Sequence, residues 1–246
     1  MRRALSVIAA LALSIGSGWV AARAYLWAVE GPPDTAAAEV PAPPPALGSS
    51  EPDAAGSSEL AQELPVFAVA GGVPLRLPDA RPVALAYHEA SMPRTVVLRP
   101  RGSCTVCRNR GKFQPPQVGP SDLEYMVMDS RGRPKPATSA IDVVLHRADR
   151  VLSPVTGRVW SVRRYRLYGR YRDVRVAILP EGRRDRLVIV IHLREVGVRR
   201  GDQVIASQTV LGRARRFPFL SQVDRYVRGR FPHVHIEVKR PPARRS

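Results

Sequence analysis

The segment from Pro232 to Val238 holds two histidines in a pattern that could do chemistry. Valine and isoleucine alternate there with histidine and glutamate. This alternation predicts a β-strand, in which His233 and His235 project from the same face. Two imidazoles held close together on a rigid strand can serve as a metal ligand and a neighbouring acid or base. The segment is therefore a candidate site.

The elements around this segment read as strands. No long helical period appears from Glu124 onward, and glycine and proline turns separate short apolar runs. The expected strands are Tyr125–Met128, Ile141–Leu145, Arg158–Val162, Val174–Leu179, Leu187–His192, Gln203–Ala206 and Val234–Val238. We predict an all-β fold for residues 124–246, an antiparallel β sandwich or half-barrel.

The chain before this domain divides into three parts. Residues 1–30 contain two early arginines and an uncharged, mostly apolar run over residues 4–22, typical of either a signal peptide or a membrane anchor. Residues 31–65 are rich in proline and alanine and predict a disordered linker. Residues 66–123 predict a small β region that packs on the next domain. Its expected strands are Val66–Ala70, Val83–Tyr87 and Thr95–Leu98.

The charge points to an anionic partner. The formal net charge is +18, and almost all of the positive charge is arginine. Peptidoglycan or other anionic envelope polymers, lipid headgroups and nucleic acid would all suit such a surface. The export-like segment predicts a periplasmic or extracellular protein, which residues 4–22 would anchor to the membrane if they are retained. With no nucleic-acid-binding motif present, we expect no nucleic-acid partner.

Cys104 and Cys107 are the chain's two cysteines and lie in a basic, glycine-flanked stretch. In an exported protein such a pair most often forms a local disulfide. A zinc site would need further ligands, and a redox role lacks the helix pattern of thioredoxin-like proteins. We therefore expect a disulfide.

From about Asp129 to Lys239 the chain resembles the lysostaphin-type (LytM) zinc metallopeptidases, which cut peptide cross-links in peptidoglycan. The closing motif of that family is Pro-His-Leu-His-Phe-Glu-Val, and this chain differs from it only at Val234 and Ile236. The family's Tyr-x-His-Leu strand corresponds to residues 190–193, without the tyrosine. Its Gly-Asp-x-Val hairpin corresponds to residues 201–204.

The resemblance implies roles for four residues. Asp142 and His235 would be zinc ligands, and His192 and His233 would handle the proton and the developing oxyanion. The family's first ligand, a histidine, falls on Thr138, and a neutral hydroxyl is a poor replacement for imidazole. The residues that could supply the third ligand instead are His146, His88, Glu89 and Asp224.

The loop before the closing motif departs from the family. The family usually has a short Gly/Ser/Thr turn there, whereas residues 213–231 form a longer segment containing Phe217, Phe219 and Tyr226. We expect this segment to form a longer wall beside the cleft.

Three functions fit the sequence. The first is an exported zinc metalloendopeptidase acting on peptidoglycan cross-links. The second is a catalytically degenerate domain that binds the cell wall or regulates another hydrolase, because a fold can persist after its chemistry is lost. The third is a basic envelope scaffold that holds anionic polymers or lipids through its arginines.

Overall fold

The computed structural model describes residues 63–108, 121–147 and 150–242. Apart from a 3₁₀ turn at Val223–Arg225, the described elements are strands. These are β1 (Val66–Ala70), β2 (Val73–Arg76), β3 (Ala84–His88), β4 (Leu98–Pro100), β5 (Ser103–Cys107), β6 (Glu124–Val127), β7 (Ala140–Val144), β8 (Arg150–Leu152), β9 (Gly157–Leu167), β10 (Tyr171–Pro180), β11 (Leu187–Arg194), β12 (Gln203–Val204), β13 (Val210–Ala214) and β14 (His233–Lys239).

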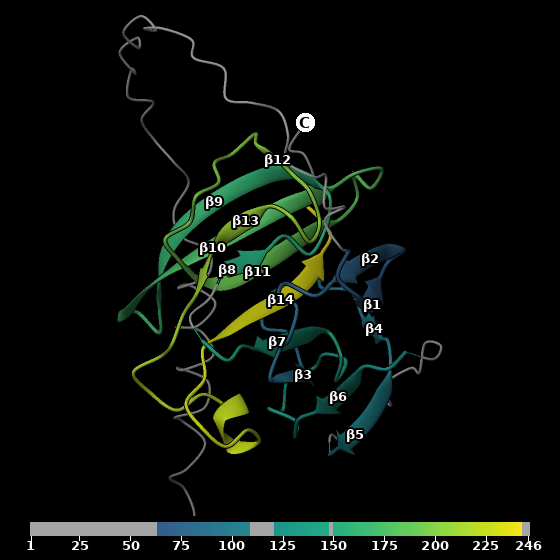
Figure 1. The fold of residues 1–246 in the computed structure, drawn as a ribbon, viewed down its shortest axis with the longest axis vertical. Helices are drawn as coiled ribbons and strands as arrows, with labels where there is room; N and C mark the ends of the chain where they lie inside the picture. The colour runs from purple at the N-terminus through teal and green to yellow at the C-terminus, as the bar shows by residue number, and fades with distance from the viewer. Residues whose placement is uncertain (1–62, 109–120, 148–149, 243–246) are drawn as a thin grey trace, which may run out of the picture.

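The strands form a small sheet and a large one (Figure 1). The small sheet has the order β2-β1-β4, and the large one has the order β12-β9-β10-β11-β14-β7-β3-β6-β5, with β13 paired to β11 and β8 paired to β13. The predicted all-β fold is confirmed, and most pairs are antiparallel. The exceptions are β6 with β3 and with β5, which are parallel. Parallel neighbours need a long connection, and the stretch between Cys107 and Glu124 supplies it for β5 and β6.

The large sheet crosses the expected boundary at residues 123 and 124. Strand β3 lies before that boundary and pairs with β7, which lies after it. The small β region therefore contributes strands to the sheet of the following domain. This pairing also brings the end of β3 next to the centre of the sheet.

The two faces of the central strands differ in character. On β14, Val234, Ile236 and Val238 pack into the main hydrophobic core, together with Val188 and Val190 of β11. Side chains that alternate with these point to the opposite face. That opposite face of β14 carries the histidines and the glutamate of the closing motif.

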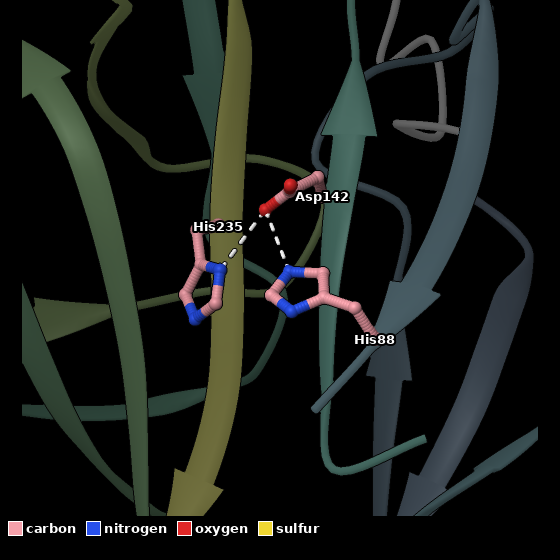
Figure 2. A group of neighbouring side chains, drawn as sticks. All are labelled: His88, Asp142 and His235. Atoms are coloured by element: carbon pink, nitrogen blue, oxygen red, sulfur yellow. Dashed lines mark hydrogen bonds and ion pairs between the residues drawn. The ribbon is translucent and has the colours of Figure 1, made fainter. Parts of the chain in front are cut away.

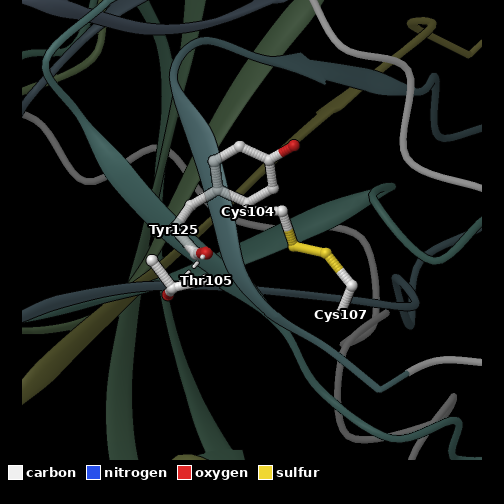
Figure 3. Close-up of a disulfide and its surroundings, with 4 residues drawn as sticks. All are labelled: Cys104, Thr105, Cys107 and Tyr125. Carbon is white, nitrogen blue, oxygen red and sulfur yellow. Dashed lines mark hydrogen bonds between the residues drawn. A yellow bond between two sulfur atoms is a disulfide. The ribbon is translucent and has the colours of Figure 1, made fainter.

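Strand β5 was not expected, because its sequence was read as a disulfide-bearing loop. The structure joins Cys104 and Cys107 by a disulfide, as predicted (Figure 3). Nearby, the Thr105 hydroxyl donates to the carbonyl oxygen of Tyr125 at 3.3 Å. The disulfide therefore lies in an edge strand of the large sheet. Three other short strands were also missed: β2, β8 and β13.

None of the described residues forms a helix long and apolar enough to cross a membrane. The predicted signal or anchor in residues 4–22 lies outside the described residues, as does nearly all of the predicted linker over residues 31–65. These two predictions stay predictions.

Candidate metal centre and catalytic site

Strand pairing brings three predicted or possible ligands together. In β14, His235 lies directly opposite Asp142 of β7. On the other side of β7, Asp142 lies opposite Ala86 of β3, so His88 is two residues away on the same face. Diagonal neighbours at this spacing are within reach of long side chains. The register thus places all three side chains over one point of the sheet.

The three side chains form a buried cluster (Figure 2). One ligand atom from each of His88, Asp142 and His235 lies within 4.8 Å of the other two. Asp142 Oδ1 is 3.1 Å from His88 Nε2 and 2.9 Å from His235 Nδ1. All three residues are at most 4% exposed. The carboxylate oxygen therefore meets both imidazoles in a site shielded from bulk water.

The hydrogen bonding of His88 fixes which nitrogen faces the cluster. Its Nδ1 is 2.9 Å from the carbonyl oxygen of Glu89, which can only accept, so Nδ1 carries the proton. Burial lowers the pKa of His88 and favours its neutral form. In that form Nε2 presents a lone pair to Asp142 Oδ1. The lone pair of His88 Nε2 and the carboxylate oxygen of Asp142 repel each other at 3.1 Å, and a cation bound between them would remove this repulsion.

His235 is held by two carboxylates. Its Nδ1 faces Asp142, and its Nε2 donates to Oε1 of the fully buried Glu237 at 3.3 Å. Burial works to lower the pKa of His235, but hydrogen bonds and charge from Asp142 and Glu237 outweigh it and raise the pKa to about 9. Without a metal ion the ring is a cation between two anions. A metal ion on Nδ1 would take the place of one proton.

The donor set fits a metal ion. Two imidazole nitrogens and one carboxylate oxygen are a usual protein contribution to a catalytic zinc site, which keeps a fourth position open. With bonds of about 2.0 Å in tetrahedral geometry, neighbouring ligand atoms lie about 3.3 Å apart. The 2.9 and 3.1 Å separations from Asp142 Oδ1 are close to that value. The cluster could therefore hold a metal ion after small adjustments.

His192 reaches this face of the sheet through a bulge in β11. Val190 lies opposite Val176, and Leu193 lies opposite Val174, so β11 uses three steps where β10 uses two. His192 has φ +70°, a conformation that residues other than glycine rarely adopt. The extra residue breaks the alternation of the strand. His192 consequently contacts the closing histidines instead of pointing into the main core.

A buried carboxylate orients His192. Its Nδ1 donates to Asp173 Oδ2 at 2.7 Å, and the Tyr165 hydroxyl donates to the same oxygen at 2.7 Å. The second oxygen of Asp173 accepts from the amide of Val174 at 2.8 Å. These bonds place the imidazole proton on Nδ1 and leave Nε2 as an acceptor. The arrangement suits a general base.

The bulge predicts an unusual order of stability at position 192. A β-carbon at positive φ costs roughly 1–2 kcal/mol, and glycine avoids that cost. We expect the His192→Gly variant to be more stable than His192→Ala by about 1 kcal/mol. Urea unfolding of the two variants measures the difference. An alanine variant as stable as the glycine variant would show that the bulge does not require this backbone conformation.

His233 lies beside His192, whose ring is also close to the metal cluster, with its centroid 5.9 Å from that of His235. Its ring centroid is 5.5 Å from that of His192, and the ring of Phe217 lies 5.2 Å from His233 and 4.7 Å from His192. Burial lowers the pKa of His233 to about 4, against the opposing charge of Asp142. Among the described residues nothing hydrogen-bonds its Nδ1. The neutral imidazole of His233 lines the cavity, where it can contact a bound substrate.

A cavity of about 780 Å³ opens over these residues. Asp142, His192, His233 and His235 line it. The loop over residues 213–231 supplies much of its wall, as predicted, through Phe217, Phe219, Leu220, Ser221, Gln222, Arg225 and Tyr226. The cavity is large enough for several residues of an extended peptide.

Two of the possible substitute ligands have other roles. The Glu89 carboxylate is bonded to the Ser130 hydroxyl and to the backbone amides of Arg131 and Arg133, at 2.9 and 3.1 Å for the amides. Asp224 accepts from the amide and the hydroxyl of Ser221 at 2.6 and 2.8 Å. Neither carboxylate belongs to the metal cluster found among the described residues.

The remaining two positions also lie outside the cluster. His146 is exposed at the end of β7 and makes an edge contact with Phe231 at 6.2 Å between centroids. Thr138 is buried, and its carbonyl oxygen accepts from the amide of Leu98 at 2.8 Å. Of the residues put forward as a third ligand, the structure therefore brings His88 to Asp142 and His235.

Sequence reasoning did not identify the two carboxylates that hold the histidines. Glu237 follows His235 by two residues on the same strand face, so the alternation of β14 contained the signal. Asp173 stands alone among the arginines and valines near the start of β10. Its role depends on the bulge in β11, for which the sequence offers no comparable signal.

Comparisons with known proteins give little beyond this geometry. No protein-family model and no curated protein matches the chain. The solution structure of lysostaphin is similar with a TM-score of 0.32 and 16% identity, over 43% of this chain and 37% of that one. A zinc-containing peptidase from Vibrio cholerae is similar with a TM-score of 0.30 and 21% identity, over 45% and 30%. The chain thus spans about a third of the length of each.

Proposed function

We propose that this protein is a zinc metalloendopeptidase that acts on the peptide cross-links of peptidoglycan in the cell envelope. His88, Asp142 and His235 would hold the zinc ion. The observation that carries the proposal is the placement of His88 Nε2 at 3.1 Å from Asp142 Oδ1, with its other nitrogen tied to a carbonyl. It supplies the imidazole that the sequence lacks at Thr138.

The residues around the cluster suit hydrolysis of an amide bond. A bound zinc ion would polarise the scissile carbonyl and lower the pKa of the attacking water. His192 Nε2 can take a proton from that water and return it to the leaving amine, because Asp173 holds its Nδ1 proton. Neutral His233 can donate a hydrogen bond to the oxyanion that develops on the carbonyl.

The substrate and the location rest on the sequence. The closing motif resembles that of enzymes that cut peptidoglycan cross-links, and the apolar run over residues 4–22 is typical of exported proteins. A net charge of +18 suits an anionic wall polymer. Together these features favour a periplasmic or extracellular enzyme, tethered through that run if it is retained.

Replacing Glu237 with glutamine tests whether this carboxylate holds His235 for metal binding. Partners that hold a metal-binding histidine typically contribute about 10–100-fold to metal affinity. We therefore expect Glu237→Gln to weaken zinc binding at least about tenfold. Because Glu237 helps to raise the pKa of His235, the variant should also be less stable than wild type without metal at neutral pH. A competing chelator measures the affinity and thermal unfolding the stability. Unchanged zinc affinity would exclude a role for Glu237 in holding His235.

Digestion of purified peptidoglycan tests the proposed activity. The whole chain, purified in detergent, should release new amino groups from cross-linked sacculi. Release should stop with a chelator and return when zinc is added. The exposed His146 provides a control, because His146→Ala should keep full activity. Sacculi that are bound and never cut, with zinc present, would contradict the proposal and favour a wall-binding or regulatory domain.

A further inference from the structure

The cavity above the catalytic histidines is lined by aromatic rings and by arginines. The aromatic wall is a row of three rings that starts at the β9–β10 hairpin, with Tyr168 5.5 Å from Phe219 and Phe219 4.9 Å from Phe217. Phe217 in turn contacts His192 and His233. The basic wall is the group of lining arginines near the segment 222–226. A substrate in the cavity would meet both aromatic rings and guanidinium groups.

Arg131 is the best-organised cation of the basic wall. Its backbone amide donates to Glu89 at 2.9 Å, and its Nε donates to the side-chain oxygen of Gln222. The side-chain nitrogen of Gln222, Nε2, donates to the backbone carbonyl oxygen of Asp129 at 2.9 Å and holds the Gln222 side chain in place. With Nε fixed in this way, the two terminal nitrogens of Arg131 form an edge suited to a carboxylate.

Arginines outnumber acidic side chains among the residues that line the cavity. Arg108, Arg131, Arg133 and Arg225 line it, and outside the metal cluster Asp129 is the acidic side chain among the lining residues. Within the described residues, Arg108, Arg131 and Arg225 make no ion pair with an aspartate or glutamate. Arg108 lies over the ring of Tyr226 at 5.9 Å. An anionic group of a ligand would therefore meet Arg108, Arg131 and Arg225, none of which forms an ion pair within the described residues.

We infer that the basic wall, centred on Arg131, binds a carboxylate of the substrate peptide close to the scissile bond, so that the site selects acidic peptides. This inference rests on the proposed function, since the wall borders the same cavity as His192 and His233. A planar carboxylate matches the fixed edge of a guanidinium through two parallel hydrogen bonds. The aromatic wall can then pack against the remainder of the peptide.

Binding of matched peptides tests the inference independently of cleavage. The probes are dansyl-labelled, C-terminally amidated alanine pentapeptides with a single glutamate at each position in turn, and the same set with glutamine. Fluorescence anisotropy on the zinc-loaded His233→Ala protein measures Kd without hydrolysis. At the best position we expect glutamate to bind about tenfold more tightly than glutamine, as a charge-assisted hydrogen-bond pair predicts.

Substitution of Arg131 assigns that preference to the basic wall. In the His233→Ala background, Arg131→Gln should reduce the glutamate preference to less than about threefold, and Arg225→Gln should reduce it partly. Arg184→Gln, in the exposed β10–β11 turn, should leave it unchanged. Equal binding of both peptide sets, or a preference that survives Arg131→Gln in a protein of normal thermal stability, would overturn the inference. Failure of the proposed function would appear separately, as a wild-type protein that cuts no sacculi.

Discussion

Replacing His88 with alanine should abolish tight zinc binding although the residue lies outside the closing motif. Loss of a supporting partner already weakens a metal site about 10–100-fold, so loss of one of three ligands should cost at least about 100-fold in affinity. His88 is buried, and its Nε2 is directed at Asp142 Oδ1. Competition with a chromogenic chelator measures the affinity, and digestion of sacculi should fall with it.

The matched variant is His146→Ala, which removes a histidine that follows the end of β7 farther from His88. Because His146 is exposed and lies outside the cluster, its loss should leave zinc affinity within about twofold of wild type. His88→Gln addresses folding, since it preserves most of the buried volume. Tight zinc binding in both His88 variants, with normal unfolding temperatures, would show that the third ligand comes from another residue.

Replacing His192 with alanine should stop hydrolysis while leaving the metal in place. General acid–base catalysis by a positioned histidine contributes about 10²–10⁴-fold, and we expect kcat to fall by that factor. His192 does not belong to the cluster of possible ligands, so zinc content should remain near that of wild type. Kinetics on a soluble cross-linked peptide, together with elemental analysis of the same sample, measure both quantities.

The Asp173→Asn variant should lose less activity than His192→Ala. The asparagine can still accept a hydrogen bond from Nδ1 but no longer stabilises a protonated ring, so kcat should fall less than in His192→Ala. If His192→Ala retains more than about a tenth of wild-type kcat, His192 is not the base.

Much of the fold could be predicted because the strands alternate strongly. In β14 the apolar residues Val234, Ile236 and Val238 enter the main core, and this pattern alone placed His233 and His235 on the opposite face. Strands β8 and β13 lack such a pattern and were missed. Strand β13 contains a glycine and an arginine among five residues, and β8 has three residues.

The site was predicted less completely, because its closure depends on long-range pairing. His88 and Asp142 are 54 residues apart, and only the β3–β7 register makes them neighbours. His192 faces the site through a bulge that breaks the alternation on which the strand prediction relied. The sequence could therefore name His88 as one of several substitutes without choosing among them.

Zinc content of the purified protein tests the central claim most directly. The whole chain, purified in detergent and dialysed against metal-free buffer, is measured by elemental analysis beside the Asp142→Ala and His235→Ala variants. We expect about one zinc ion per wild-type chain and almost none in either variant, as for a site with three protein ligands. A wild-type protein that retains less than about a tenth of an equivalent, or variants that keep their zinc, would contradict a metal centre at His88, Asp142 and His235.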